Sequence, residues 1–185
     1  MLHSMRQFDD LTYVHSVNVA LIASILGQWL KFSEKDIRIL TISGLLHDIG
    51  KIMIPNEILT KPGKLTVAEY NIMKQHVNFG YEKVKNQNID IRIKEACLLH
   101  HEKCDGTGYP FGLKSDHIPA VAKIIAIADV YDAMTSARVY RGALCPFEVI
   151  DTMYKDAFTK FEPEYILPFL KNVACLLYTS DAADD

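Results

Sequence analysis

Apolar residues recur at helical spacing along most of the chain. Between Thr12 and Leu30 the apolar positions are Val14, Val17, Leu21, Ile25, Leu26 and Trp29. Steps of three and four residues place these side chains on one face of a helix. No stretch alternates apolar and polar residues over the length of a strand, so the pattern predicts an all-α fold.

Capping residues and prolines predict where the other helices begin. Ser33, with an acid three residues later, starts a helix that runs to about Leu46. The capping box from Thr66 to Glu69 starts a helix that continues through His76. Further helices are expected from Asp90 to His100, from Pro119 to Met134, and from Pro146 and Pro163 onward. Without repeats or a linker, the chain is predicted to form one helical domain.

Composition narrows the class of protein. A length of 185 residues corresponds to roughly one domain. The content of 49% hydrophobic and 23% charged residues is ordinary for a globular protein and excludes a disordered chain. The formal charge of −3 excludes a basic field able to hold long nucleic acid, although a local cluster can still bind a small anion.

Cysteines and hydropathy indicate the compartment. The four cysteines form no C-x-x-C pair, which favours reduced thiols in a cytosolic protein. No apolar run reaches the ~18 residues of a membrane span, and residues 1–10 lack the apolar core of a signal peptide. We therefore expect a cytoplasmic location and no membrane association of this chain.

The two ends look unlike domain sequence. Residues 1–11 are interpreted as a short N-terminal lead that has been truncated. Residues 175–185 show no helical pattern or cap, and we interpret them as a translated vector or adapter tail, with a frayed natural terminus as the alternative.

Candidate chemistry rests on histidines and aspartates. His47 is followed by Asp48, and His100 and His101 are adjacent. Imidazoles with a carboxylate that can bridge are ligands that first-row transition metals favour. Each piece alone has an ordinary alternative, since a His-Asp pair also ends helices and a lone histidine such as His15 or His76 also packs in a core.

Asp129 strengthens the metal hypothesis. It interrupts the apolar helical run from Ile124 to Val130, where an unpaired carboxylate is costly. A metal ion is its simplest partner, and an arginine is the alternative.

The ordered motifs resemble the HD-GYP family. They are His47-Asp48 with Gly50-Lys51, His100-His101-Glu102, Asp105-Gly106-Thr107-Gly108-Tyr109-Pro110, Asp129-Val130-Tyr131-Asp132-Ala133 and Arg138-Val139-Tyr140-Arg141. The resemblance implies an HD-type helical bundle over residues 12–172 with a metal site in its core. It also implies a metal-dependent phosphodiesterase that opens cyclic di-GMP to the linear dinucleotide pGpG, and onward to GMP, by attack of a metal-bridging hydroxide.

The resemblance also implies roles for individual residues. The ligands of one metal would be His15, His47, Asp48 and Asp129, and those of a second His76, His100 and His101, with Asp48 bridging. Lys51 would lie near the scissile phosphate, although a lysine here also suits a helix C-terminus. Asp132 would orient a ligand or accept a proton.

Substrate contacts are implied at two further places. Arg138 and Arg141 match positions that bind the phosphates and guanines, with a solvated basic patch as the alternative. Gly108-Tyr109-Pro110 lies in a loop that would dock substrate or a signalling-protein partner, with a simple turn as the alternative.

The sequence departs from the family at three positions. Members with three metals carry a Glu four residues before the first-helix histidine, and Leu11 stands there. The resemblance therefore implies two divalent ions, iron or manganese. Cys104 replaces a bulky aromatic and Ala137 an acid, and neither position holds a ligand. Two alternative functions are hydrolysis of another cyclic dinucleotide and a catalytically weak module that binds a ligand or partner.

Overall fold

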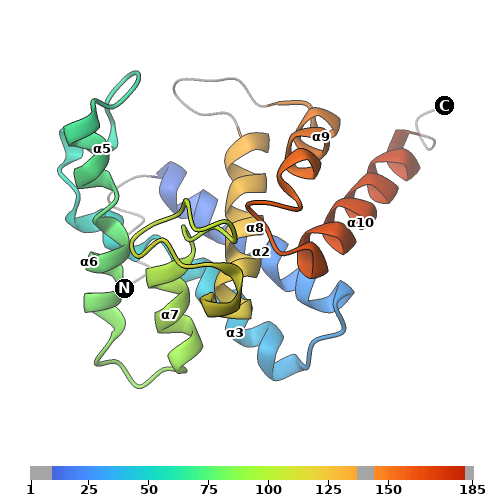
Figure 1. Ribbon diagram of the computed structural model, residues 1–185, viewed down its shortest axis with the longest axis horizontal. Coiled ribbons are helices and arrows are strands. Elements are labelled where there is room, and N and C mark those ends of the chain that lie inside the picture. The colour runs from blue at the N-terminus through green and yellow to red at the C-terminus, as the bar shows by residue number, and fades with distance from the viewer. Residues whose placement is uncertain (1–9, 137–143, 182–185) are drawn as a thin grey trace.

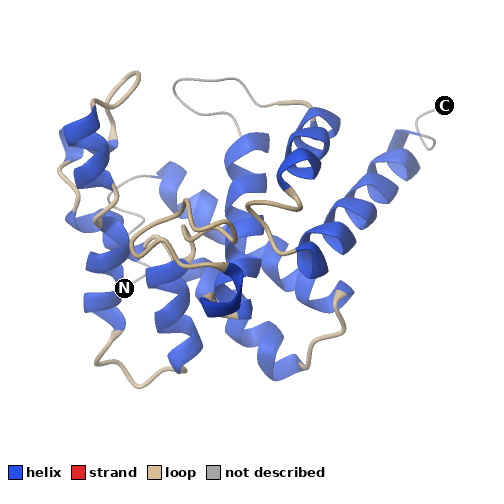
Figure 2. Cartoon of the chain, in the orientation of Figure 1, coloured by secondary structure: helices blue, strands red, loops and turns tan. Residues whose placement is uncertain are grey.

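The computed structural model describes residues 10–136 and 144–181 (Figure 1). Its helices are α2 (Asp10–Trp29), α3 (Glu34–Leu46), α4 (Asn56–Leu59), α5 (Val67–Met73), α6 (His76–Val84), α7 (Ile91–Leu99), α8 (Ala120–Thr135), α9 (Pro146–Asp156) and α10 (Pro163–Asp181), with 3-10 turns η1 (Ile49–Met53) and η2 (Ser115–His117). The described residues contain no strand (Figure 2), which confirms the all-α prediction.

The predicted caps form where the sequence places them. The Ser33 hydroxyl accepts a hydrogen bond from the Asp36 amide at 3.2 Å. Thr66 and Glu69 make both bonds of a capping box, and the Asp90 carboxylate accepts from the Arg92 amide at 3.0 Å. Such caps satisfy amides that a helix leaves unpaired in its first turn.

The helix boundary near His76 differs from the prediction. The helix expected through His76 ends at Met73, and a separate helix, α6, begins at His76. The Gln75 amide bonds to the Ile72 carbonyl rather than one residue further back, so the chain tightens between the two helices. α6 then turns Val77 and Val84 into the core, which orients His76 inward as well.

The C-terminal helix is longer than the sequence pattern suggested. The expectation that the helical pattern ends before Cys175 is wrong, because α10 runs to Asp181. Leu177 packs against the main core, and the Tyr178 ring lies 5.4 Å from that of Phe147 on α9. Packing against α9 explains why this segment is helical despite its weak local pattern.

Close packing of α2 on α3 organises the centre of the molecule. In Figure 1 these helices and α8 lie between the α5–α6 side and the α9–α10 side. A Cβ on Gly44 of α3 would lie only 2.5 Å from the Ala20 Cα of α2, so the glycine allows the two backbones to approach. The largest fully buried apolar side chains of the main core include Leu26, Leu40, Ile124, Ile125, Ile127 and Phe169.

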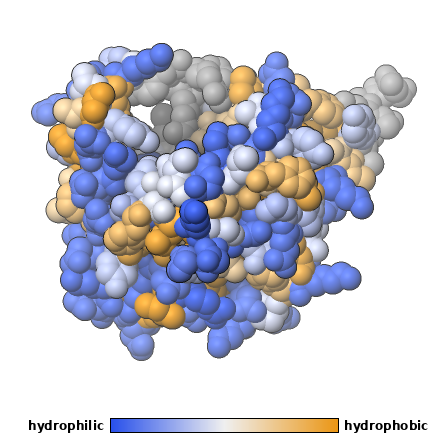
Figure 3. All heavy atoms as spheres, in the orientation of Figure 1, coloured by the Kyte–Doolittle hydropathy of each residue, from blue (hydrophilic) through white to orange (hydrophobic). Residues whose placement is uncertain are grey.

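The surface is of mixed character. Figure 3 shows hydrophobic side chains in small groups separated by hydrophilic ones. No helix in the described part of the chain is long and apolar enough to cross a membrane.

Candidate metal centre

The structure brings the seven side chains predicted as metal ligands into one place. They come from α2, from the end of α3, from the start of α6, from the end of α7 and from α8. Two groups of potential ligand atoms each lie within 4.8 Å of one another. One group is His15, His47 and Asp129, and the other is Asp48, His76, His100 and His101.

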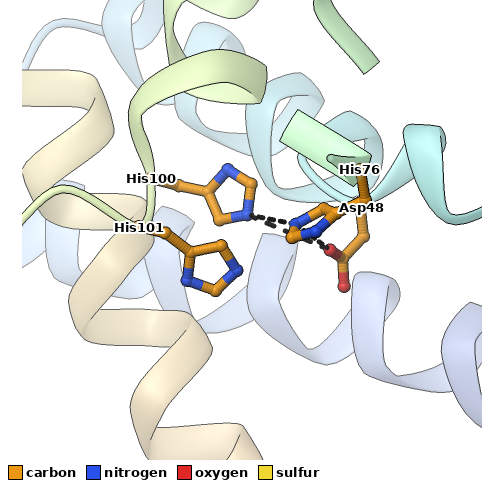
Figure 4. Close-up of side chains that lie close together, drawn as sticks. All are labelled: Asp48, His76, His100 and His101. Carbon is orange, nitrogen blue, oxygen red and sulfur yellow. Dashed lines mark hydrogen bonds and ion pairs between the residues drawn. The ribbon is translucent and has the colours of Figure 1, made fainter. Parts of the chain in front are cut away.

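Asp48 lies between the two groups. Its Oδ1 is 3.3 Å from His76 Nε2 and 3.9 Å from His100 Nε2, and these side chains point toward one another in Figure 4. Its Oδ2 is 3.3 Å from His47 Nε2 and 3.6 Å from His15 Nε2. One carboxylate thus presents an oxygen to each group, which is the geometry of a bridging ligand.

Backbone carbonyls orient three of the imidazoles. Nδ1 of His47, His76 and His100 lies 2.7, 2.8 and 2.9 Å from the carbonyl oxygens of Gly44, Met73 and Ala96, respectively. A carbonyl only accepts, so each Nδ1 carries a hydrogen, and the neutral form of each imidazole then has its lone pair on Nε2. This tautomer is the one that holds a metal through Nε2.

Buried polar atoms in the cluster are left without partners. Among the described residues, His47 Nε2 and Asp48 Oδ1 make no hydrogen bond although both are buried. An unpaired buried polar atom costs roughly 1–3 kcal/mol. A cation between the two groups would satisfy both atoms, so the residues present fit a metal.

Electrostatics keep most of these groups in the form that binds cations. Burial would raise the pKa of Asp48, but the Lys51 ammonium holds that pKa well below its usual range. Desolvation lowers the pKa of His100 strongly and that of His101 to about 3. These imidazoles are therefore neutral near pH 7, as metal ligands must be.

His15 is held by two carboxylates. Its Nδ1 donates to Asp132 Oδ2 at 2.6 Å, and its Nε2 lies 3.0 Å from Asp129 Oδ1. Burial alone would lower the pKa of His15, but these carboxylates raise it to about 9. Asp132 is itself fixed by Asn18 at 2.8 Å and Ser136 at 3.0 Å, so it orients the imidazole from behind.

The loop of residues 105–113 folds back over this centre. The Tyr109 ring stacks on His101 with centroids 4.7 Å apart, and the Tyr109 amide donates to the His101 carbonyl at 3.2 Å. The buried Glu102 carboxylate accepts from the amides of Phe111 and Leu113 at 2.7 and 2.9 Å. Glu102 therefore ties the loop to the turn that carries His100 and His101.

Sequence reasoning assigned no role to two of these supporting residues. Neither Asn18 nor Glu102 is a candidate metal ligand. Asn18 acts through a hydrogen bond to Asp132, which is distant in sequence, and Glu102 acts through hydrogen bonds that depend on the conformation of the loop. The motif His100-His101-Glu102 singled out Glu102 without indicating what it binds. Lys51 does face the cluster, with its Nζ 2.6 Å from Asp48 Oδ2, whereas Arg138 and Arg141 lie outside the described residues.

Comparisons with known proteins show the family of this chain. The HD domain family model matches residues 6–165, so the chain belongs to the HD domain family. It is 38% identical over 170 residues to a cyclic di-GMP phosphodiesterase of Pseudomonas aeruginosa, covering 91% of this chain and 41% of that protein. It is 41% identical over 157 residues to the cyclic di-GMP phosphodiesterase response regulator RpfG of Xanthomonas campestris, covering 84% and 42%. The chain thus spans about two-fifths of these relatives.

A third relative and two solved structures extend the comparison. The 3'3'-cGAMP-specific phosphodiesterase 1 of Vibrio cholerae is 40% identical over 148 residues, covering 78% of this chain and 34% of that protein. An HDG"Y"P protein of Bdellovibrio bacteriovorus superposes with a TM-score of 0.72 at 22% identity, covering 88% of this chain and 52% of that one. The HD domain of Listeria monocytogenes PgpH also gives 0.72, at 19% identity, covering 95% and 94%. The relatives confirm the HD-GYP resemblance, and the structures confirm the fold.

Proposed function

We propose that this chain is a metal-dependent phosphodiesterase that hydrolyses a cyclic dinucleotide. The observation that carries the proposal is Asp48, buried between two groups of ligand atoms and presenting one oxygen to each. Two cations held in this way suit in-line attack on a phosphodiester. Relatives named as cyclic di-GMP phosphodiesterases support the substrate class.

Cyclic di-GMP is the substrate we propose, with pGpG as product and GMP as a further product. A second candidate is 3'3'-cGAMP, because relatives named as specific for it match at 35–40% identity. The two ligands differ in one base, so residues that contact the bases decide between them.

The protein's own residues would share the work of the reaction. Bound iron or manganese ions, two per chain, would supply an activated water and neutralise charge on the phosphate. Lys51, whose Nζ lies beside Asp48, would add a positive charge near the scissile phosphate. Asp132 would hold His15 in its ligand orientation and accept a proton released there.

The remaining contacts would bind and orient the substrate. Tyr109 covers His101 and would contact the dinucleotide from the loop side. Arg138 and Arg141 would bind phosphate or guanine, since a guanidinium suits both. We further propose a cytoplasmic domain of residues 12–172, a short lead of residues 1–11, a non-native tail from Cys175 whose first residues continue α10, and a signalling partner docking at Gly108-Tyr109-Pro110.

Turnover by the purified chain tests the proposal. Protein loaded with Mn²⁺ or, without oxygen, with Fe²⁺ is incubated with cyclic di-GMP or 3'3'-cGAMP, and products are separated by chromatography. We expect pGpG from cyclic di-GMP, and no product from the Asp48→Asn variant. A metal-loaded chain that leaves both dinucleotides intact would overturn the proposal.

A further inference from the structure

A lysine and two tyrosines form a cluster at the edge of the candidate metal centre. Lys74 follows α5, and its Nζ lies 5.3 Å from the ring centre of Tyr70 and 6.0 Å from that of Tyr109. Tyr70 belongs to α5 and Tyr109 to the loop that follows α7. The contact with Tyr70 is ordinary for residues four apart on a helix, but the contact with Tyr109 joins two distant segments.

The cluster lies one aromatic ring away from the second group of ligands. The Tyr109 ring that faces Lys74 also stacks on His101 at 4.7 Å and lies 6.5 Å from the His76 ring. Lys74 is half-buried, while Tyr70 is 49% exposed. The ammonium group thus lies near the ring that covers His101, on a side chain that is only partly buried.

No carboxylate among the described residues neutralises the charge of Lys74. No carboxylate in residues 10–136 and 144–181 forms an ion pair with it, whereas Lys51 is paired with Asp48 at 2.6 Å. Tyrosine faces attract a cation without neutralising it. Lys74 therefore remains able to bind an anion near the centre.

A cyclic dinucleotide brings two phosphodiesters to such a site. Only one of them can lie at the metal ions while it is hydrolysed, and the other keeps its negative charge. Removing that charge from water is costly unless a cation meets it.

We propose that Lys74, held by Tyr70 and Tyr109, binds the phosphodiester that is not being hydrolysed. The inference rests on the proposed function, because it assigns this subsite to the same cyclic dinucleotide. Lys74 would then determine specificity for substrates with a second phosphate and take no part in bond cleavage.

Two substrates distinguish this role from a structural one. Bis(p-nitrophenyl) phosphate has a single phosphodiester, whereas cyclic di-GMP has two. In the metal-loaded Lys74→Met variant we expect KM for cyclic di-GMP to rise about tenfold, because one charge-assisted hydrogen bond to the substrate is lost. The kcat should stay within about twofold of the value for the unmodified chain. Cleavage of bis(p-nitrophenyl) phosphate should be unchanged, and Lys74→Arg should restore most of the affinity.

Lys83→Met is the matched control, because it removes the same charge from an exposed position on α6. An unchanged KM for cyclic di-GMP in Lys74→Met would overturn the inference, as would a parallel loss with both substrates. Equilibrium binding of cyclic di-GMP separates the two hypotheses. If the chain binds cyclic di-GMP without hydrolysing it, and Lys74→Met weakens that binding, the proposed phosphodiesterase activity is overturned and the Lys74 subsite stands. If the unmodified chain does not bind cyclic di-GMP, both proposals are overturned.

Discussion

Asp48 is the side chain on which both groups of ligand atoms depend. Its Oδ1 faces His76 and its Oδ2 faces His15, so each oxygen faces a different group. Among the described residues, Asp129 shares this property. Its Oδ1 faces His15, and its Oδ2 lies 3.9 Å from His101 Nδ1. Asp48, at the end of α3, and Asp129, on α8, therefore connect the two groups of ligand atoms from two different helices.

The first prediction concerns Asp48. Replacing it with Asn removes the negative charge that both cations would share, so metal content should fall and hydrolysis should drop by at least about a hundredfold. Elemental analysis and turnover of cyclic di-GMP measure the two effects. Retention of most metal and activity would show that the site is misassigned.

The second prediction concerns the residue behind His15. Asp132→Asn should weaken metal affinity by about tenfold to a hundredfold, because it loses the charged partner that orients the imidazole. Competition with a chelator measures this affinity. Ser136→Ala is the control, since it removes one of the bonds to Asp132 at 3.0 Å and should have a smaller effect. Equal effects of the two variants would contradict the orienting role.

At the scale of elements, the contact between η1 and α6 positions His76. A Cβ on Gly50 would lie 1.9 Å from the His76 carbonyl oxygen and 2.4 Å from the Gly80 amide nitrogen. The two backbones therefore touch, and a side chain at Gly50 would push α6 away from Asp48.

The third prediction follows from that contact. Gly50→Ala should destabilise the metal-free chain by about 1–3 kcal/mol and reduce metal binding. Gly80→Ala is the matched control, because its Cβ would meet only ordinary contacts at 3.4 Å or more and the helix gains from alanine. Urea unfolding and elemental analysis measure both properties. If Gly50→Ala matched Gly80→Ala, the backbone contact would not position the site.

At the scale of the whole molecule, the candidate metal centre links five separate parts of the chain. α2, α3, α6, α7 and α8 each contribute to it, so bound ions would act as a cross-link between them. Without ions, the unpaired atoms on His47 and Asp48 oppose folding.

The fourth prediction is that metal loading stabilises the fold. Free metal at a hundred times its Kd should add about 2.7 kcal/mol, which corresponds to a rise in Tm of about 5–10 °C for a chain of this size. Thermal unfolding with and without a chelator measures the shift. An identical Tm in both conditions would argue against ions bound at this centre.

The fifth prediction is a stoichiometry of two ions per chain. The described residues form two groups of ligand atoms, and Leu11, at the position of a third-site Glu in the family, offers no oxygen. Elemental analysis should therefore find two, and Leu11→Glu is the change expected to recruit a third. Three fully occupied ions in the unmodified chain would contradict this prediction.

Local sequence determined most of the helices. Caps at Ser33, Thr66 and Asp90 depend on side chains a few residues from the amides they satisfy, so their positions can be predicted without the rest of the fold. The ordered motifs likewise contain five of the seven candidate ligands, and the family resemblance implied the other two, His15 and His76. Chemistry restricts such ligands to a few residue types, which makes their pattern visible in sequence.

Only the tertiary structure decided how those parts meet. The start of α6 at His76 depends on packing against η1, and the extension of α10 past Cys175 depends on contacts with α9 and the core. The grouping of ligand atoms around Asp48 and the anchoring of the loop by Glu102 join residues far apart in the chain or in turns without a regular pattern. Long-range packing sets these distances, and hydrophobic periodicity carries no record of them.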